Sequence, residues 1–218
     1  MVGRLGVYYE ILQKWNPRLH LVSSCSPEEF AVRHVLESLW ILRYLPDGSR
    51  IIDIGSGGGL PIVPCLITRD DLTATLIESS RRKSVFLREA LRISGALDRS
   101  QLIVDRFEQI KPPPTDFISC RALDRFPQML PKLIDWAPAN STLLLFAGAG
   151  LKSQLEGLLP GARAELIPGS EGRFLIVASS TRPSCPEFKL FSLVSLKKWH
   201  GRPVESGARC ACHLKLTN

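Results

Sequence analysis

The chain has 218 residues, and its 28 Lys and Arg against 21 Asp and Glu give a formal net charge of +7 at pH 7. Hydrophobic residues make up 44% and charged residues 22%, which is typical of folded proteins and excludes a wholly disordered chain. The length favours one globular domain, and the longest uncharged apolar stretch, 142–151, is about half as long as a membrane-spanning helix.

Helices and strands are expected to alternate after a helical N-terminal segment. Apolar residues at helical spacing predict helices over Val7–Trp15 and Pro27–Tyr44. Short apolar or β-branched runs then predict strands, and amphipathic stretches between them predict helices. The expected strands are Arg50–Ile54, Thr73–Ile77, Gln101–Val104, Asp116–Cys120, Thr142–Phe146 and Arg173–Ala178, and the expected helices are Pro61–Thr68, Ser80–Ser94 and Pro127–Trp136.

This alternation predicts an α/β protein with a doubly wound, mostly parallel, seven-stranded Rossmann-like sheet. We expect a single domain over 1–180, with a helical cap at 1–48 and the α/β core at 49–180. Residues 181–218 hold seven basic and two acidic side chains. They are interpreted either as a solvated, poorly ordered tail or as a basic arm that grips a nucleic-acid backbone.

The six cysteines are scattered, and the first ten residues carry no secretion signal, so we expect a cytoplasmic protein with reduced thiols. Cys210, Cys212 and His213 are the nearest approach to a metal-binding pattern. No second ligand pair lies at a suitable spacing, and we therefore predict no metal site.

The most informative stretch runs from Ile51 to Pro61, where a buried strand leads into a glycine-rich turn and then a helix. Four glycines in five positions let the backbone approach a ligand and adopt positive φ. Dinucleotide sites of the G-x-G-x-x-G type are one alternative, but Leu60 occupies the third glycine position. Asp53, Gly55, Gly57 and Gly59 form the Asp-x-Gly-x-Gly-x-Gly pattern usual in loops that bind S-adenosylmethionine.

Glu78 ends the second expected strand, where its carboxylate can accept hydrogen bonds from both hydroxyls of a ribose. This feature supports an adenosine ligand without separating NAD from S-adenosylmethionine. Asp105 and Glu108 follow the third strand, near the expected place of an adenine ring, and are equally interpretable as solvated loop residues.

A second concentration of positive charge lies on the helix expected over 80–94. Arg81, Arg88 and Arg92 share one face with position 85, and Arg82 and Lys83 lie beside them. The face is interpreted either as a phosphate-binding surface or as an ordinary solvated helix surface.

These residues together resemble a known family, the bacterial methyltransferases that modify N7 of a guanine in small-subunit (16S) ribosomal RNA, of the glucose-inhibited division protein B type. The resemblance covers roughly residues 12–178. It rests on the glycine loop closing with Leu60 and Pro61, and on further matches at Trp15, Asn16, Val32, Arg33, His34, Glu37, Ser38, Glu78, Arg82, Lys83, Phe86, Leu87, Arg106, Glu108, Arg121 and Ala122.

The resemblance implies the cofactor S-adenosyl-L-methionine and a 16S ribosomal RNA or small-subunit substrate. We expect the protein to be a monomer. Cofactor contacts are implied at Gly55, Leu60, Phe107, Glu108 and Arg121. Arg33, His34, Arg82, Arg106 and Arg121 are implied to line the RNA cleft, and we add Lys83 and Arg88 to the RNA-binding set. Alternatively, Arg33 and Glu37 form a simple helix ion pair, and His34 is a satisfied core histidine.

The sequence departs from the family pattern at several positions. His20 replaces an asparagine, Ile62 replaces a glycine after Pro61, and Cys120 replaces a serine before Arg121. The stretch 146–150 lacks the lysine expected near the end of the fifth strand. These differences bear on substrate binding and on the level of activity.

Guanine N7 has a free lone pair, so its methylation needs alignment and charge tolerance but no general base. Arg121, at the end of the fourth strand, is the predicted catalytic residue, orienting the guanine or the cofactor carboxylate. Three alternatives remain open at this point. Cys120 could serve as a covalent nucleophile, the chain could be a nicotinamide oxidoreductase, or it could be a ribosome-binding protein that has lost turnover.

Overall fold

The computed structural model describes residues 1–121, 126–159 and 161–180. The expected basic tail at 181–218 lies outside these residues, as do Cys210, Cys212 and His213. The division into a domain over 1–180 and a tail therefore stays a prediction.

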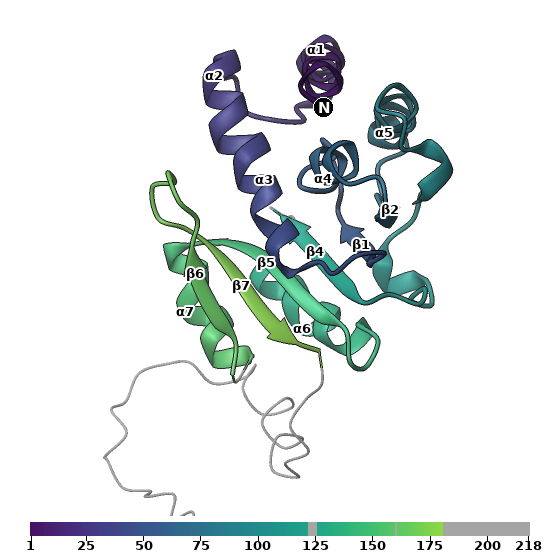
Figure 1. The fold of residues 1–218 in the computed structure, drawn as a ribbon. Helices are drawn as coiled ribbons and strands as arrows, with labels where there is room; N and C mark the ends of the chain where they lie inside the picture. The colour runs from purple at the N-terminus through teal and green to yellow at the C-terminus, as the bar shows by residue number, and fades with distance from the viewer. Residues whose placement is uncertain (122–125, 160, 181–218) are drawn as a thin grey trace, which may run out of the picture. The chain divides into compact units, whose positions relative to one another are not determined.

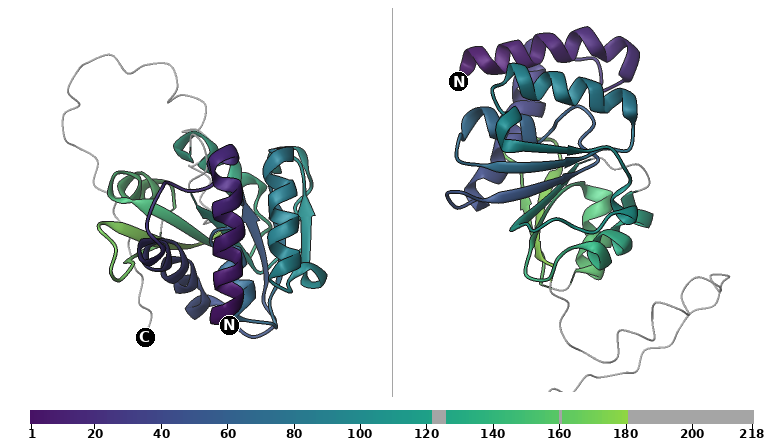
Figure 2. Two further views of the ribbon diagram at one scale, coloured as in Figure 1. Left: turned by 90° about the horizontal axis from the view of Figure 1, so that it is seen from above. Right: turned by 90° about the vertical axis from the view of Figure 1, so that its right-hand side faces the viewer.

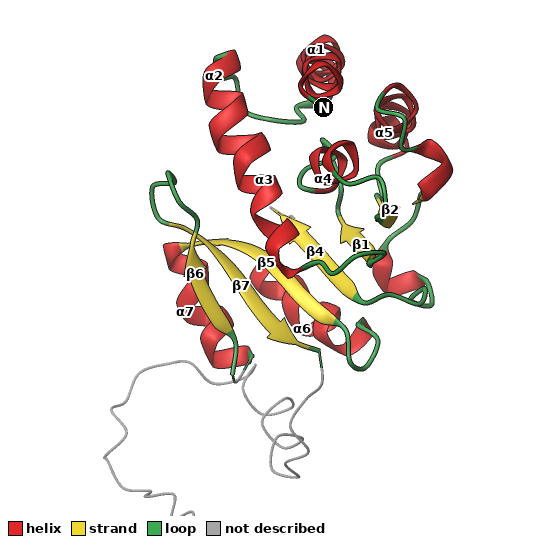
Figure 3. Ribbon diagram, viewed as in Figure 1, coloured by secondary structure: helices red, strands yellow, loops and turns green. Residues whose placement is uncertain are grey.

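Seven strands form one sheet in the order β3-β2-β1-β4-β5-β7-β6, which confirms the predicted fold class (Figure 3). The strands are β1 (Arg50–Ile54), β2 (Thr73–Ile77), β3 (Ser100–Ile103), β4 (Phe117–Arg121), β5 (Thr142–Gly148), β6 (Arg163–Leu166) and β7 (Arg173–Ser179). β1 to β5 pair in parallel, whereas β7 is antiparallel to both β5 and β6. The strand order reverses beside β1, and ligands of such sheets bind near that point.

Helices cover both faces of the sheet (Figure 1). They are α1 (Val2–Leu19), α2 (Pro27–Phe30), α3 (Glu37–Leu39), α4 (Ile62–Thr68), α5 (Arg81–Ile93), α6 (Phe126–Trp136) and α7 (Ala149–Leu158), with short 3₁₀ turns at Leu97–Arg99 and Phe107–Gln109. One buried cluster joins α1, α4 and α5 to the sheet, and a second joins α6 and α7 to its other face. Both faces of the central strands are buried, as their apolar sequences require.

The N-terminal segment forms the expected helical cap. Between α2 and α3 the chain passes through a π-helical stretch, Ala31–Leu36, and after α3 through a 3₁₀ stretch, Trp40–Tyr44, so that helical backbone is continuous over 27–44. α1 lies alongside α5 on the outer side of the sheet (Figure 2). Trp15 Nε1 of α1 donates to Glu89 Oε2 of α5 over 2.9 Å.

Two elements of the sheet region were not assigned from the sequence. β6 is an edge strand whose residues Arg163 and Leu166 are exposed, so it lacks a continuous apolar signal. α7 begins within the apolar run that also forms β5, which hid the boundary between strand and helix. Within the described residues, no helix is both long enough and apolar enough to cross a bilayer.

The departure at His20 has a local explanation. His20 follows α1 as its C-terminal cap and has φ 49° and ψ 54°, in the left-handed region. Asparagine, the usual residue of the family at this position, is favoured there, and histidine is also enriched among the non-glycine residues that adopt it. Ile62, the second departure, is fully buried in the first turn of α4 and contributes to the core.

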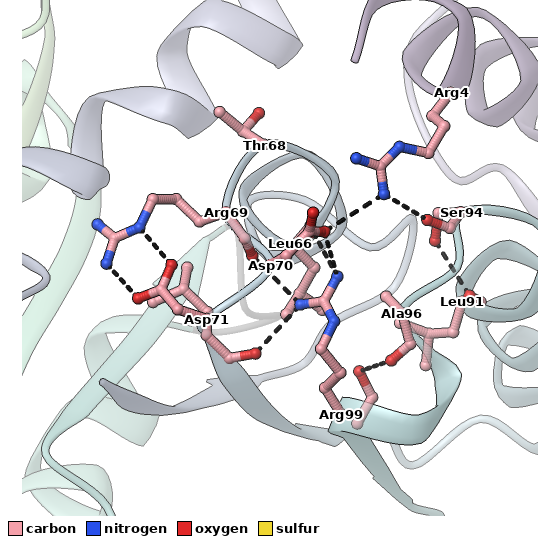
Figure 4. A network of polar contacts seen from close by, with 12 residues as sticks. Arg4, Leu66, Thr68, Arg69, Asp70, Asp71, Leu91, Ser94, Ala96 and Arg99 are labelled. Carbon is pink, nitrogen blue, oxygen red and sulfur yellow. Dashed lines mark hydrogen bonds and ion pairs between the residues drawn. The ribbon is translucent and has the colours of Figure 1, made fainter. Parts of the chain in front are cut away.

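A network of arginines and aspartates lies at the end of the sheet where β1 and β2 begin (Figure 4). Arg99 donates to the carbonyl oxygens of Leu66, Arg69 and Leu72 at 2.7, 3.2 and 3.1 Å and also contacts Asp70. Arg69 forms a bidentate pair with Asp71. Arg99 thereby satisfies carbonyl groups where α4 ends and β2 begins.

Replacing Arg99 with methionine should lower the free energy of unfolding by about 2 kcal/mol, because three carbonyl groups lose a charged donor while the apolar stem is kept. Urea denaturation measures this change. Arg92→Met on the exposed surface of α5 is the matched control and should change stability by less than about 0.5 kcal/mol. Equal losses in the two variants would contradict this role of Arg99.

Candidate active site

The glycine loop lies between β1 and α4, at the carboxyl end of the sheet beside the point where strand order reverses. Gly55, Gly57 and Gly59 have φ of 70°, 49° and 80°, so three of the four glycines adopt the conformation that favours glycine. Gly55 N donates to Ile77 O of β2 over 2.8 Å, and Gly59 N donates to Ser56 O over 2.6 Å. A Cβ on Gly59 would lie 2.6 Å from Val63 Cγ2.

Glu78 joins this loop to the end of β2. Its Oε2 accepts from Gly57 N over 2.8 Å, and its Oε1 accepts from Ser80 N over 2.7 Å. The residue is 6% exposed. Each carboxylate oxygen retains a second lone pair, so Glu78 can shape the loop and still accept hydrogen bonds from ribose hydroxyls.

Asp53 is fully buried beneath the loop, at the end of β1. Its Oδ1 accepts from Ser119 Oγ of β4 over 2.6 Å, whereas its Oδ2 has no hydrogen-bond partner within the described residues. Burial raises the pKa of Asp53 to about 7, although hydrogen bonds from Ser119 and Ser56 act in the opposite direction. A buried oxygen without a partner next to an open backbone loop indicates a place for a polar ligand group.

These residues fit S-adenosylmethionine better than a dinucleotide. Residues 53–63 contain no basic side chain, and α4 has only seven residues. A pyrophosphate would therefore meet neither a cation from this segment nor a long helix dipole. A cofactor without phosphate needs neither, and Glu78 supplies the acceptors for its ribose.

Arg121 ends β4 and is held by the helical cap. Its Nη2 donates to Glu37 Oε2 over 3.1 Å and to Arg33 O over 3.0 Å, and Nη1 lies 3.4 Å from Ser38 Oγ. The same Glu37 oxygen accepts from Arg173 Nη1 of β7 over 2.9 Å. The predicted catalytic side chain is only 11% exposed. Glu37 thus pairs with Arg121 and Arg173, which replaces the simple Arg33–Glu37 helix pair considered from the sequence.

His34 lies against this cluster. Its Nδ1 is 3.1 Å from Arg121 Nη2, and because a guanidinium only donates, Nδ1 must act as the acceptor. Burial, together with the charges of Arg121, Arg173 and Arg33, lowers the pKa of His34 to about 4. The imidazole is therefore neutral at pH 7, and its ring packs 5.3 Å from that of Phe30.

The other two predicted cofactor residues follow β3. Phe107 is 4% exposed, and its ring meets Trp136 edge-on in the second core cluster, with ring centroids 5.5 Å apart. The ring therefore packs in the core, and the carbonyl oxygen of Phe107 accepts from Ile110 N over 3.3 Å. Glu108 is half-buried, with Oε1 3.9 Å from Lys132 Nζ of α6. Leu60, in contrast, closes the glycine loop and is 8% exposed.

The residues predicted to bind RNA lie in separate places. Arg33 is exposed on the cap beside Arg121, and Arg106 is exposed after β3. Arg82 is exposed and Lys83 half-buried in the first turn of α5, next to Glu78. Arg88 is exposed six residues further on, about 9 Å along the helix axis. Arg81, Val85 and Arg92 are exposed as well, so the predicted shared face of α5 is open to solvent.

Three contributors to this region were missed from the sequence. Tyr8 of α1 donates to Gly58 O in the glycine loop, Ser119 contacts Asp53, and Arg173 shares Glu37 with Arg121. Each of these contacts joins residues that are far apart in the sequence, so local motifs could not reveal them. Cys120 is fully buried in the second core cluster, so its thiol is not exposed to solvent. Within the described residues, no group of three potential metal ligands lies close together.

Residues 2–159 match the family described as rRNA small subunit methyltransferase G, GidB. A protein of that name from Ruegeria pomeroyi is 35% identical over 157 residues, which cover 70% of this chain and 76% of the relative. Another, from Neisseria meningitidis serogroup C, is 30% identical over 165 residues, covering 76% and 75% of the two chains.

The chain belongs to this family. Membership of the methyltransferase G family confirms the resemblance predicted from the sequence, together with the predicted enzyme class and its cofactor, S-adenosylmethionine. Solved structures share the fold. An RNA methyltransferase from Salinibacter ruber, in complex with S-adenosyl-L-homocysteine, has a TM-score of 0.56 at 14% identity and covers 75% of this chain and 98% of its own. An O-methyltransferase from Bacillus cereus also has a TM-score of 0.56, at 16% identity.

The raised pKa of Asp53 makes a prediction about stability. In the unfolded chain the carboxyl ionises near pH 4, whereas in the folded protein it holds its proton up to about pH 7. The folded state binds more protons between these values, so this group's contribution to stability falls as pH rises from 4 to 7.

Asp53→Asn removes this titration and keeps an acceptor for Ser119. The free energy of unfolding of the variant relative to the natural protein should therefore rise by about 2 to 3 kcal/mol from pH 5 to pH 8. Urea denaturation at both values measures the difference, and titrations common to both proteins, including that of His34, cancel. A difference independent of pH would show that Asp53 is ionised in the folded protein throughout this range.

Proposed function

We propose that this chain transfers a methyl group from S-adenosylmethionine to N7 of a guanine in 16S ribosomal RNA, acting as a monomer on the RNA or on the small subunit. One observation carries the proposal. In a chain of the methyltransferase G family, a glycine loop without basic side chains lies where the strand order reverses and is hydrogen-bonded to Glu78. The relatives are named as methyltransferases of small-subunit ribosomal RNA, which supports this substrate. Guanine N7 comes from the family resemblance.

Asp53, Gly55, Gly57, Gly59, Leu60 and Glu78 are the residues that we assign to the cofactor, with Phe107, Glu108 and Arg121 completing the set. S-adenosylmethionine supplies an electrophilic methyl group on a positively charged sulfur. The open loop backbone provides close approach without adding positive charge, since residues 53–63 hold no basic side chain.

The proposed reaction needs no general base, because guanine N7 attacks the methyl group with a lone pair that carries no proton. His34 is neutral at pH 7, but its Nδ1 is already engaged by Arg121. We assign Arg121 the role of orienting the guanine or the cofactor carboxylate. Glu37, Arg33 O and His34 hold its guanidinium in one place, so little conformational entropy is lost when a ligand contacts it.

Transfer of labelled methyl from S-adenosylmethionine to small subunits that lack the modification tests the proposal. Nucleoside mass spectrometry should find 7-methylguanosine at one position of 16S RNA. Arg121→Lys, which keeps a charge beside Glu37 but offers fewer donors, should lower turnover at least tenfold. Arg163→Gln, at an exposed position of β6, should leave turnover unchanged.

Each other outcome points elsewhere. Cofactor binding without transfer to 16S RNA would favour the protein that binds ribosomes without turnover, or another RNA substrate. Tighter binding of NAD than of S-adenosylmethionine would favour the oxidoreductase.

We further propose that the α5 surface formed by Arg82, Lys83 and Arg88, together with Arg33, His34 and Arg106, contacts the RNA. Arg82 and Arg88 are exposed, and they extend the site from the cofactor loop along the helix. Phosphate contacts release condensed cations, so their number sets the salt dependence of binding.

The double variant Arg82→Gln, Arg88→Gln should bind 16S RNA more weakly and should lower the slope of log affinity against log salt by about one to two. Affinity for S-adenosylhomocysteine should be unchanged. Filter binding at several salt concentrations measures the slope, and Arg163→Gln is the charge-matched control for one arginine. An unchanged slope would show that Arg82 and Arg88 of α5 do not contact the RNA.

A further inference from the structure

Three side chains of the first helix of the cap, those of Arg4, Tyr8 and Trp15, make polar contacts with residues outside the cap. At one end, Arg4 Nη1 lies 3.4 Å from Asp70 Oδ1 and 3.5 Å from Ser94 O (Figure 4). Towards the other end, Trp15 donates to Glu89 of α5. Between them, the hydroxyl of Tyr8 donates to Gly58 O. Of these three side chains, only that of Tyr8 contacts the glycine loop.

Tyr8 is completely buried and is held by packing. Its ring centroid lies 6.3 Å from that of Phe30, in the core cluster that also contains Leu60 and Val63. Burial raises the pKa of the phenol, with the charges of Arg121 and Asp53 acting on it as well, so the hydroxyl keeps its proton and remains a donor. A fixed donor therefore lies against Gly58 of the loop.

The hydrogen bond from Tyr8 constrains the peptide group between Gly58 and Gly59 in the glycine loop. Gly58 C=O and Gly59 N–H belong to one planar peptide unit. Gly59 N donates to Ser56 O over 2.6 Å, so Tyr8 fixes one side of this unit while Ser56 fixes the other. Peptide units between glycines rotate with little steric hindrance, and an external hydrogen bond selects one orientation.

The loop is also supported from the turn that follows α1. A Cβ on Gly58 would lie 3.3 Å from Leu21 O, so the two backbones are in close contact. Asn16 holds that turn, because its Oδ1 accepts from Leu21 N and Val22 N at 2.8 and 3.0 Å, and its Nδ2 donates to Val22 O over 3.0 Å. The cap therefore meets Gly58 through a side chain and through its backbone.

We propose that Tyr8 is a positioning residue for the cofactor, which it serves by holding the Gly58–Gly59 peptide in the orientation that binds S-adenosylmethionine. The inference rests on the proposed function for the identity of the ligand. It makes α1 part of the cofactor site, although α1 carries none of the residues expected to touch the ligand.

The test compares Tyr8→Phe with Trp15→Phe. Both remove one hydrogen bond between α1 and the core and keep an aromatic ring, but only the first affects the loop. Isothermal titration with S-adenosylhomocysteine should show affinity about fivefold to tenfold weaker in Tyr8→Phe, as expected for a lost buried hydrogen bond, and within twofold of the natural protein in Trp15→Phe. Hydrogen exchange at 55–59, without ligand, should be faster only in Tyr8→Phe.

Equal affinity in Tyr8→Phe and the natural protein would overturn the inference. So would weakening of the same size in both variants that follows their loss of thermal stability, because that result would describe cap docking in general. If Tyr8→Phe does not fold, Gly58→Ala provides the second test. Its methyl group presses on Leu21 O with Tyr8 intact, and unchanged affinity there would contradict a role for the cap in shaping the loop.

These results separate from those on the proposed function. If the protein bound S-adenosylhomocysteine normally but did not methylate 16S RNA, the proposed reaction would be wrong and the proposed role of Tyr8 would be unaffected. If the natural protein bound no S-adenosylhomocysteine, the proposed cofactor role would be wrong for both. Exchange at 55–59 would then still report whether Tyr8 holds the loop.

Discussion

The glycine loop between β1 and α4 has almost no side chains of its own, and its shape must come from hydrogen bonds that other elements provide. Glu78 holds Gly57, β2 holds Gly55, and Tyr8 holds Gly58. These partners come from two separate parts of the chain, the end of β2 with the adjoining Glu78, and α1. The openness that lets a ligand approach the backbone is the same property that makes the loop depend on its surroundings. The rest of the domain can be understood as the means of bringing these partners to one place.

Buried charge forms the second constraint on the site. Glu37 is almost fully enclosed and meets two arginines, one from β4 and one from β7. A buried carboxylate is costly without such partners, so loss of either arginine would destabilise the contact between the cap and the two strands. Burial in this cluster, together with the positive charges of Arg121, Arg173 and Arg33, lowers the pKa of His34 and keeps it neutral at pH 7. Arg121 is therefore presented as a fixed group rather than as a flexible surface arginine.

The cap connects the two halves of the proposed activity. Its first helix supports the cofactor loop through Tyr8, and its second helical segment holds Arg121 and presents Arg33 to solvent. One N-terminal segment thus supports both the glycine loop and the surface that we propose for RNA binding. Asn16 holds the turn after α1 that lies against Gly58, whereas Trp15 ties α1 to Glu89 of α5.

The sequence by itself determined the alternation of strands and helices, the ligand loop and the acidic residue that follows β2. These features are local, because a run of glycines or an apolar strand has the same conformational consequence wherever it stands. It did not determine β6, whose edge position leaves no apolar pattern, or the boundary between β5 and α7. The tertiary structure alone decided that Glu37 pairs with Arg121 and Arg173, that Asp53 keeps an oxygen without a partner, and that Tyr8 reaches Gly58. Each of these contacts joins residues between 50 and 136 positions apart or depends on complete burial, and neither property is written in local spacing.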